Sequence, residues 1–461
     1  MPIDPSIFRA YDIRGVAHEQ ITEEACRAVG QAFGTVLRRM YGIGHPRVAV
    51  GRDARTHGPL FERAVVDGLV SSGCHVLLIG ATPSPVNYFA VCNGKLDGSI
   101  QVTASHNPPT DNGLKLQIRD AHAFAGNDLQ TLREQIEKRD VLTGEGSREE
   151  ENAASAYVEH HVRAFAGAGQ GQRIVVDGGN GIAGPVNCSV LKGVGATITE
   201  LFIEPDGAFP NHPADPSKHD TLRWLQERVR ADKAAVGFAF DGDGDRLGVV
   251  DDQGKILTAD EVLLLLARDH LSRHPGGRVV CTVSNSGTIL TEVRHWGGEP
   301  VMCKVGHSFV EHAMREHGAL LGGEQSGHFF CGEDSYGYDD ALVAALRVLK
   351  ILQSDARPLS SIREDFPRVY QAHERRPRCP DDTKADVVRR VTEHFAKTHP
   401  VETMDGARID FGDDAWAGIR QSNTSPRLSI CIEARSPEKL AAVEKEVLGH
   451  LETYEEIDFR D

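Results

Sequence analysis

Three times along this 461-residue chain, a short apolar run leads directly into a polar or glycine-containing loop. The runs are Arg47–Asp53 (RVAVGRD), Arg173–Gly181 (RIVVDGGNG) and Arg278–Asn285 (RVVCTVSN). Short apolar strands that alternate with helix-period segments are typical of largely parallel sheets covered by helices. We therefore expect an α/β protein with three related αβα three-layer domains and mixed sheets.

The first of these domains shows the pattern most fully. A helix is predicted over 21–40, because apolar residues recur there at helical spacing after Thr22, a residue type that caps helix N-termini. Strands are predicted at Arg47–Asp53, His75–Gly80, Ser99–Ser105 and Asn112–Ile118. The polar stretch 143–153 (TGEGSREEENA) is predicted to be a linker, followed by a helix near 154–166.

The pattern changes after Pro367. A helix near 382–397, two strands around a loop within Trp416–Ala434, and a C-terminal helix predict a small α+β domain. The expected domains are 1–152, 153–253, 254–367 and 368–461. Their loops are expected to face a central cleft, because multidomain α/β chains commonly bind ligands between domains.

Composition limits the partners and the compartment. The net charge, 51 minus 67 or −16, argues against nucleic acid or an anionic membrane surface as a partner. The N-terminus lacks the basic start and apolar core of a signal peptide, and no apolar run is long enough to span a membrane. Nine cysteines without a CxxC pair are typical of a reduced chain, so a cytoplasmic location is expected.

The strongest local signal is Asp241–Arg246 (DGDGDR). Carboxylates at alternate positions, separated by glycines, can converge as hard oxygen ligands for a divalent cation. A calcium loop is an alternative, since Asp252 lies at its twelfth position. However, Arg246 stands at the sixth position, where that loop needs glycine, and the flanking residues are predicted strands. An acidic hairpin tip is the plain structural alternative.

A second signal is Thr103–Pro109 (TASHNPP), directly after a predicted strand. It places the Ser105 hydroxyl at a strand end, where α/β active sites gather, although serine needs a base or metal to become a nucleophile. Taken alone, the segment also fits an Asn-Pro turn with a capping serine. Ser105 and His106 are not expected to form a dyad, because adjacent side chains at a strand end usually point apart.

Two further loops carry polar groups suited to a sugar phosphate. Gly322–His328 (GGEQSGH) offers a carboxylate and a hydroxyl, and Arg420–Pro426 (RQSNTSP) offers an arginine, hydroxyls and an amide suited to phosphate. Each also fits an ordinary polar turn. Tyr11–Gly15 and Lys304–Ser308 are weak signals alone. The absence of a GxxxxGK[ST] loop counts against a nucleoside-triphosphate enzyme.

Taken together, these motifs resemble the α-D-phosphohexomutase superfamily over nearly the whole chain and in the family's order. YDIRG and TASHNP lie in the first domain, DGDGDR in the second, GEQSGH in the third and RxSNTSP in the fourth. The resemblance is to the bacterial phosphomannomutase/phosphoglucomutase branch. It implies interconversion of hexose 1-phosphate and hexose 6-phosphate, with mannose and/or glucose as the sugar, through a phosphoserine and a hexose 1,6-bisphosphate intermediate.

The resemblance also implies a role for each matching residue. Ser105 would carry the phosphate, and one Mg²⁺ would be held by Ser105, Asp241, Asp243 and Asp245. The remaining catalytic groups would be Arg14, Lys115, Arg246 and His307. The substrate would be bound by Tyr11, Glu324, Ser326, Arg420, Ser422, Asn423 and Thr424. The partners would be small hexose phosphates, with hexose 1,6-bisphosphate as activator, and the chain would be a monomer or dimer.

Two positions depart from that branch. Gln325 stands where methionine is more usual, and GEQSGH is typical of phosphoglucosamine mutases, which makes that activity the main alternative. Ser284 aligns with a substrate-contacting lysine of the branch, so another cation would have to compensate. A non-catalytic sugar-phosphate sensor and a metal-dependent phosphatase are rival interpretations. The intact nucleophile and metal motifs count against the sensor, and the intact sugar loop counts against the phosphatase.

Overall fold

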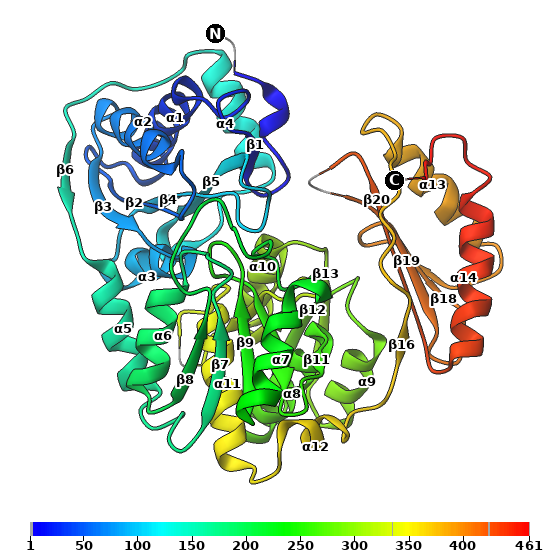
Figure 1. Ribbon diagram of the computed structural model, residues 1–461. Coiled ribbons are helices and arrows are strands. Elements are labelled where there is room, and N and C mark those ends of the chain that lie inside the picture. The colour runs from blue at the N-terminus through cyan, green and yellow to red at the C-terminus, as the bar shows by residue number, and fades with distance from the viewer. Residues whose placement is uncertain (1–2, 334, 423–424, 461) are drawn as a thin grey trace. The chain divides into compact units, whose positions relative to one another are not determined.

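The computed structural model describes residues 3–333, 335–422 and 425–460. The chain forms two compact units. Unit 1 consists of Met1–Leu266 and Ser326–Arg363, and unit 2 consists of Ala267–Gln325 and Glu364–Asp461. Figure 1 shows the course of the chain and the labels of its elements.

The first sheet of unit 1 has six strands in the order β1-β5-β4-β2-β3-β6. β2 pairs in parallel with β3 and β4, whereas β5 pairs antiparallel with β4 and β1. The strands are β1 (Ile13–Val16), β2 (Arg47–Arg52), β3 (His75–Ala81), β4 (Gly98–Val102), β5 (Asp111–Ile118) and β6 (Ser147–Glu150). The helices are α1 (Glu23–Tyr41), α2 (Gly58–Ser71), α3 (Ser84–Gly94) and α4 (Asn127–Glu137).

One prediction for this region was wrong. The stretch 143–153, predicted to be a linker, contributes β6, which pairs in parallel with β3 at the edge of the sheet. All four residues of β6 are exposed and three of them are charged, so the segment lacks the buried apolar positions by which strands are recognised. Charged side chains on an edge strand also protect it from pairing with other chains.

The second sheet of unit 1 has the order β11-β10-β9-β7-β8. β7 pairs in parallel with β8 and β9, and β9 and β10 form an antiparallel hairpin. The strands are β7 (Arg173–Asp177), β8 (Thr197–Leu201), β9 (Val236–Phe240), β10 (Leu247–Asp251) and β11 (Ile256–Leu257). Unit 1 also contains α5 (Ala153–Ala164), α6 (Gly184–Gly193), α7 (Arg223–Asp232), β15 (Phe329–Cys331), α11 (Ala341–Ser354) and α12 (Leu359–Arg363).

Unit 2 begins within α8 (Ala259–Arg273) and contains a parallel arrangement of three strands. β12 lies between β13 and β14 and pairs in parallel with both. The elements are β12 (Arg278–Thr282), α9 (Gly287–His295), β13 (Glu299–Cys303), α10 (His307–His317) and β14 (Leu321–Gly323). With the two sheets of unit 1, this arrangement confirms the predicted class of mixed α/β sheets.

The second sheet of unit 2 is antiparallel throughout, with the order β16-β20-β19-β18-β17. Its elements are β16 (Tyr370–Gln371), α13 (Lys384–Phe395), β17 (Val401–Glu402), β18 (Ala407–Asp410), β19 (Trp416–Gln421), β20 (Leu428–Ala434) and α14 (Pro437–Leu451). The predicted C-terminal α+β domain is therefore confirmed, including the two strands around the loop that follows Arg420. The short strands β16, β17 and β18 were not predicted.

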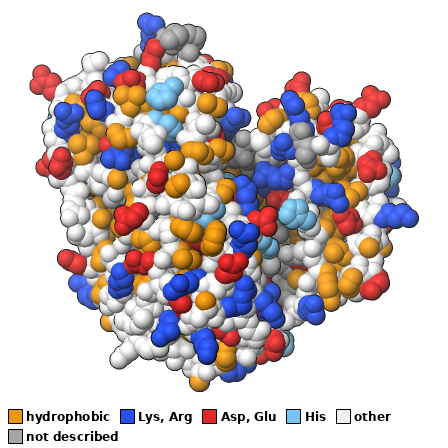
Figure 2. All heavy atoms as spheres, in the orientation of Figure 1, with side chains coloured by type: hydrophobic (Ala, Val, Ile, Leu, Met, Phe, Trp, Pro, Cys, Tyr) orange, Lys and Arg blue, Asp and Glu red, His pale blue; other side chains and the backbone are white. Residues whose placement is uncertain are grey.

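Among the described residues, no helix is both long enough and apolar enough to cross a membrane. On the face shown in Figure 2, acidic and basic side chains are interspersed. None of the nine cysteines forms a disulfide.

Candidate active site

Ser105 lies in the loop that follows β4, and its backbone is left-handed, with φ of +51°. The side chain is buried, and its Oγ donates a hydrogen bond to Asp241 Oδ2 (2.8 Å). Oγ also lies 3.1 Å from His106 Nδ1. The expectation that these adjacent side chains point apart was wrong, because the left-handed turn at Ser105 interrupts the alternation of an extended strand.

The segment that follows β9 gathers three aspartates. Asp241 Oδ1 accepts hydrogen bonds from the backbone N–H groups of Gly244, Asp245 and Arg246 (2.9, 3.1 and 3.2 Å), which curls the chain around this carboxylate. Asp241, Asp243 and Asp245 are fully buried, and one ligand atom from each lies within 4.8 Å of the others. The flanking elements are the strands β9 and β10, so a helix–loop–helix calcium site is excluded.

Lys115, from β5, lies against two of these carboxylates. Its Nζ is 2.7 Å from Asp243 Oδ2 and also contacts Asp245 Oδ2. Burial alone would lower the pKa of Lys115, but the two carboxylates outweigh burial and raise this pKa well above its ordinary value. In return, Lys115 helps to hold the pKa values of Asp243 and Asp245 below the ordinary range despite their burial. Lys115 therefore places a positive charge beside these carboxylates.

The three-aspartate cluster fits a divalent metal ion. Asp243 Oδ1 is buried without a hydrogen-bond partner among the described residues. Burial, together with repulsion from Asp245 and Asp243, raises the pKa of Asp241. A hard cation would satisfy the unpaired oxygen and relieve the repulsion, and carboxylate oxygens are the ligands that Mg²⁺ prefers.

Two arginines complete the charges around Ser105. Arg14, in β1, pairs with Asp12 (Nε to Oδ2, 2.6 Å) and donates from Nη1 to the carbonyl of Ala104 (2.9 Å). Burial opposes the charged form of both Arg14 and Arg246. Neighbouring carboxylates outweigh it and raise both pKa values, so both side chains stay cationic. The structure thus brings Ser105, the three aspartates, Lys115 and both arginines together. Tyr11, three residues before Arg14, is partly exposed.

His328 belongs to the site but was not singled out from the sequence. Its Nε2 lies 3.4 Å from Asp245 Oδ1 and 3.3 Å from Arg246 Nε, and its Nδ1 lies 2.9 Å from Ser326 Oγ. The histidine closes the GEQSGH motif, so attention to every polar residue of that motif would have identified it. Ser84, whose Oγ donates to Asp243 Oδ2 (2.6 Å), carried no comparable motif signal.

In unit 2, Glu324 and His307 lie by the loop before α10. Glu324 is buried, and its Oε1 accepts a hydrogen bond from the backbone N–H of Gly306 (2.7 Å). His307 is buried at the first position of α10. Ser284 is also buried. The cation near it is Arg408, whose Nη1 donates to the backbone carbonyls of Val283 and Asn285, the two residues that flank Ser284.

The loop between β19 and β20 carries the remaining predicted ligands. Arg420 Nε is buried and has no hydrogen-bond partner among the described residues. Ser422 Oγ accepts a hydrogen bond from Arg376 Nη2 (3.2 Å), and Lys384 Nζ donates to the Ser422 carbonyl (2.8 Å). Two predicted ligands, Asn423 and Thr424, lie outside the described residues.

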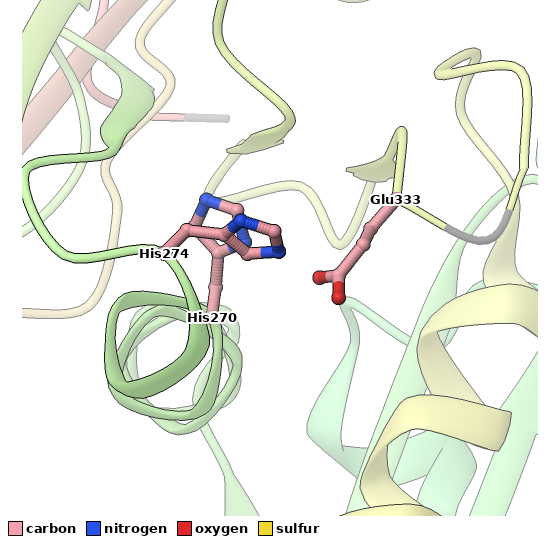
Figure 3. A group of neighbouring side chains, drawn as sticks. All are labelled: His270, His274 and Glu333. Atoms are coloured by element: carbon pink, nitrogen blue, oxygen red, sulfur yellow. The ribbon is translucent and has the colours of Figure 1, made fainter.

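Unit 2 also contains a histidine pair that no motif predicted. His270, in α8, and His274, just beyond it, are four residues apart and therefore lie on one helix face. Their ring centroids are 4.8 Å apart. Figure 3 shows both side chains as sticks. Two imidazoles supply only half of a typical tetrahedral ligand set, so the pair by itself defines no metal site.

Comparison with family models assigns the class. Models of phosphoglucomutase/phosphomannomutase match four consecutive segments: α/β/α domain I at 5–142, domain II at 155–254, domain III at 258–370 and the C-terminal domain at 374–450. The chain belongs to the α-D-phosphohexomutase superfamily, a family of isomerases. Its four-domain architecture confirms the predicted fold class.

Individual relatives show which members of the superfamily this chain is similar to. The chain is 38% identical to a phosphomannomutase/phosphoglucomutase of Pseudomonas aeruginosa over 95% of this chain and 94% of that protein. It is 35% identical to a probable phosphoglucosamine mutase of Methanopyrus kandleri, with 94% of each covered. A crystal structure of a phosphoglucomutase/phosphomannomutase family protein from Burkholderia thailandensis matches with a TM-score of 0.91 and 36% identity. That match covers 99% of this chain and all of that one.

Proposed function

We propose that this protein interconverts hexose 1-phosphate and hexose 6-phosphate, with mannose and/or glucose as the sugar, in the cytoplasm. The reaction runs through a phosphoserine at Ser105 and a hexose 1,6-bisphosphate intermediate. The observation that carries the proposal is the hydrogen bond between Ser105 Oγ and Asp241 Oδ2 (2.8 Å) within a cluster of three buried aspartates. A serine that only stabilised a turn would not need this metal-ligand geometry beside it.

Phosphoryl transfer depends on position and charge neutralisation more than on covalent chemistry by the protein. The phosphoserine and the substrate phosphate together place a total of about four negative charges in the active site. Asp241, Asp243 and Asp245, with a phosphoserine oxygen, would hold one Mg²⁺, and the ion would neutralise charge on the transferring group. Arg14, Arg246 and Lys115 supply further positive charge there, which explains how an acidic protein binds an anionic substrate.

The sugar hydroxyl that receives the phosphoryl group must lose a proton, and the leaving oxygen must gain one in the reverse step. We propose Lys115 and His307 as the groups that handle this proton or polarise the reacting oxygen, and His328 as a further candidate for proton transfer. His328 lies beside Asp245 and Arg246, so it is close to the reacting phosphate.

The other end of the substrate is assigned to a second set of residues. Glu324 and Ser326 would bind the 3- and 4-hydroxyls, which roughly exchange places when the sugar turns over, and Tyr11 would line the same site. Arg420, Ser422, Asn423 and Thr424 would bind the phosphate that is not reacting. Arg420, in β19, and Lys384, whose Nζ donates to the Ser422 carbonyl, bring two cations to this loop and support an anion partner there.

Two measurements test the proposal. Peptide mass spectrometry of the purified protein should find phosphate on Ser105, and Ser105→Ala should remove nearly all mutase activity. An unphosphorylated Ser105 together with a fully active Ser105→Ala enzyme would refute the mechanism and leave the sugar-phosphate sensor as the better interpretation.

The sugar is tested by turnover of mannose 1-phosphate, glucose 1-phosphate and glucosamine 1-phosphate under one set of conditions. We expect similar kcat/KM values for mannose 1-phosphate and glucose 1-phosphate, because Glu324 and Ser326 would bind hydroxyls common to both sugars. We expect a lower kcat/KM for glucosamine 1-phosphate. A preference for glucosamine 1-phosphate would favour the phosphoglucosamine mutase alternative. Gln325 and the similarity to the Methanopyrus kandleri protein are the observations that keep this alternative open.

A further inference from the structure

The backbone of Ser105 requires support from its surroundings. A residue other than glycine with φ of +51° is uncommon and persists only where neighbouring groups hold it. The Ser105 N–H donates to Thr103 Oγ1 (2.9 Å), but one hydrogen bond does not fix the loop that follows. The proposed reaction adds and removes a doubly charged group at this residue, so the loop must keep its conformation through both states.

Arg55 supplies that support. It is among the largest fully buried side chains of the molecule, and its guanidinium binds four backbone carbonyls of the loop. Nη2 donates to Ser105 (2.9 Å) and Asn107 (2.7 Å), and Nη1 donates to Pro108 (2.5 Å) and Asp111 (2.9 Å). A planar guanidinium with five donors suits this task better than any other side chain.

Asp53 orients the guanidinium from the opposite side. Asp53 Oδ2 accepts hydrogen bonds from Arg55 Nε (3.0 Å) and Thr103 Oγ1 (2.7 Å), and Oδ1 accepts one from the Arg55 backbone N–H (3.0 Å). Asp53 is fully buried at the end of β2. Through Thr103, the same carboxylate is linked to the backbone N–H of Ser105, so Asp53 and Arg55 together hold both sides of the nucleophile.

The loops of the second sheet close over this arrangement. A Cβ on Gly242, between the first two aspartates, would lie 2.4 Å from the Ser105 carbonyl oxygen, so only glycine fits. Gly207 approaches the backbone of Arg55 in the same way, and the Phe209 ring lies 5.4 Å from the guanidinium. The Ser105 carbonyl therefore accepts a hydrogen bond from Arg55 and packs against Gly242, which fixes the nucleophile relative to the aspartates.

We propose that Arg55, oriented by Asp53, is a positioning residue for phosphoryl transfer. Its guanidinium binds four carbonyls, so it acts through the loop rather than on the sugar. It holds Ser105 in the left-handed conformation that directs Oγ toward Asp241. The inference rests on the proposed function, because a nucleophile has to be placed accurately only if Ser105 reacts.

The test compares Arg55→Met and Arg55→Lys with the wild-type enzyme, measuring kcat, KM for glucose 1-phosphate and phosphate on Ser105 after incubation with glucose 1,6-bisphosphate. We expect Arg55→Met to lower kcat by about 100-fold, the loss that a misplacement of about 1 Å can cause, with KM within about threefold. Arg55→Lys should recover part of kcat, because an ammonium still donates to some of the carbonyls. Occupancy of Ser105 by phosphate should fall in the same order.

Arg38 provides a matched control. It belongs to α1, and its Nη1 donates to the backbone carbonyls of Ser72 (2.8 Å) and Thr143 (3.1 Å), so it also binds carbonyls of the first domain. Arg38→Met should reduce stability without changing kcat per folded molecule or the phosphate on Ser105. Should Arg55→Met not fold, Asp53→Asn provides the test, with a loss in kcat of about 10-fold and unchanged KM expected, because Arg55 stays in place but is oriented less firmly.

The outcomes separate this inference from the proposed function. The positioning role is overturned if Arg55→Met (or Asp53→Asn, where Arg55→Met does not fold) changes kcat no more than Arg38→Met does. It is also overturned if that variant raises KM and keeps kcat. In both cases Ser105 remains the nucleophile. If Ser105→Ala is fully active and wild-type Ser105 carries no phosphate, the proposed function itself fails.

Discussion

The residues proposed to bind phosphate differ in burial between the two units. In unit 1, Ser105 and its aspartates are almost completely buried, and fixed cations and backbone N–H groups surround them. In unit 2, Arg420 is partly exposed at the end of a hairpin strand. Burial strengthens electrostatic interactions and limits reorganisation, which suits a reacting group. A partly exposed loop can release the phosphate at one end of a substrate and then bind the phosphate at the other end. We expect substitutions in unit 1 to lower kcat and those in the unit 2 loop to raise KM.

The largest expected effect is at Asp243. Asp243→Asn removes one charge from the proposed metal site while keeping the shape of the side chain, and it weakens the ion pair with Lys115. We expect kcat to fall on the order of 10³-fold, with little recovery in excess Mg²⁺, because a ligand has been lost. Steady-state kinetics at several Mg²⁺ concentrations measures this. Full recovery of kcat at high Mg²⁺ would show that Asp243 only tunes metal affinity.

Arg420 tests the other side of the comparison. Arg420→Ala should raise KM about 10- to 100-fold and change kcat much less, because the lost charge-assisted hydrogen bonds act on substrate and transition state alike. Some loss of kcat is expected, since a displaced distal phosphate also misaligns the reacting one. The comparison breaks down if Arg420→Ala abolishes kcat at saturating substrate while Asp243→Asn changes only KM.

A smaller effect is expected at Lys384, at the start of α13. Its Nζ donates to the carbonyls of Ser422 (2.8 Å) and Ser425 (3.4 Å), and Ser422 is one of the predicted phosphate ligands. Lys384→Met should raise KM about fivefold, the effect of one net hydrogen bond, through a less ordered loop. The exposed Lys397, just beyond α13, supplies the control Lys397→Met, which should leave KM unchanged. Equal KM values for the two variants would remove Lys384 from the phosphate loop.

Acid stability offers a further test of unit 1, which buries a histidine that makes no side-chain hydrogen bond among the described residues. His161 has no hydrogen bond to either ring nitrogen among the described residues, and burial lowers its pKa to about 3. Below pH 6.5 the unfolded chain binds a proton there that the folded chain does not, so stability is lost as the pH falls. His161→Phe should remove this loss, about 2 kcal/mol at pH 5 relative to pH 7.

Urea unfolding at both pH values, followed in unit 1, measures the effect of His161→Phe. The exposed His312 of unit 2 supplies the control, and His312→Gln should show the pH dependence of the wild-type protein. A similar loss of stability between pH 7 and pH 5 in the wild-type protein and His161→Phe would contradict the assignment.

The parts of the fold that the sequence predicted are those with buried periodic residues or a strong motif. The strands that became β2, β3, β5, β9 and β10 were predicted from their recurring apolar residues, which the structure buries. The exposed β6 and the two-residue β17 lack that signal. In the site, motifs identified Ser105 and the aspartates. Arg55 was missed, because an arginine that binds four carbonyls distant in the sequence leaves no local pattern. His106 was misjudged, because strand alternation does not apply after a left-handed residue.

The left-handed backbone at residue 105 also limits which amino acid could act as the proposed nucleophile. Threonine carries the same hydroxyl and can be phosphorylated, but a β-branched side chain at positive φ is a genuine outlier in proteins. Ser105→Thr should therefore be a poor substitute although its chemistry is conserved, and cysteine would keep the backbone but change the reacting atom. The local conformation thus restricts this position to serine among the hydroxyl amino acids.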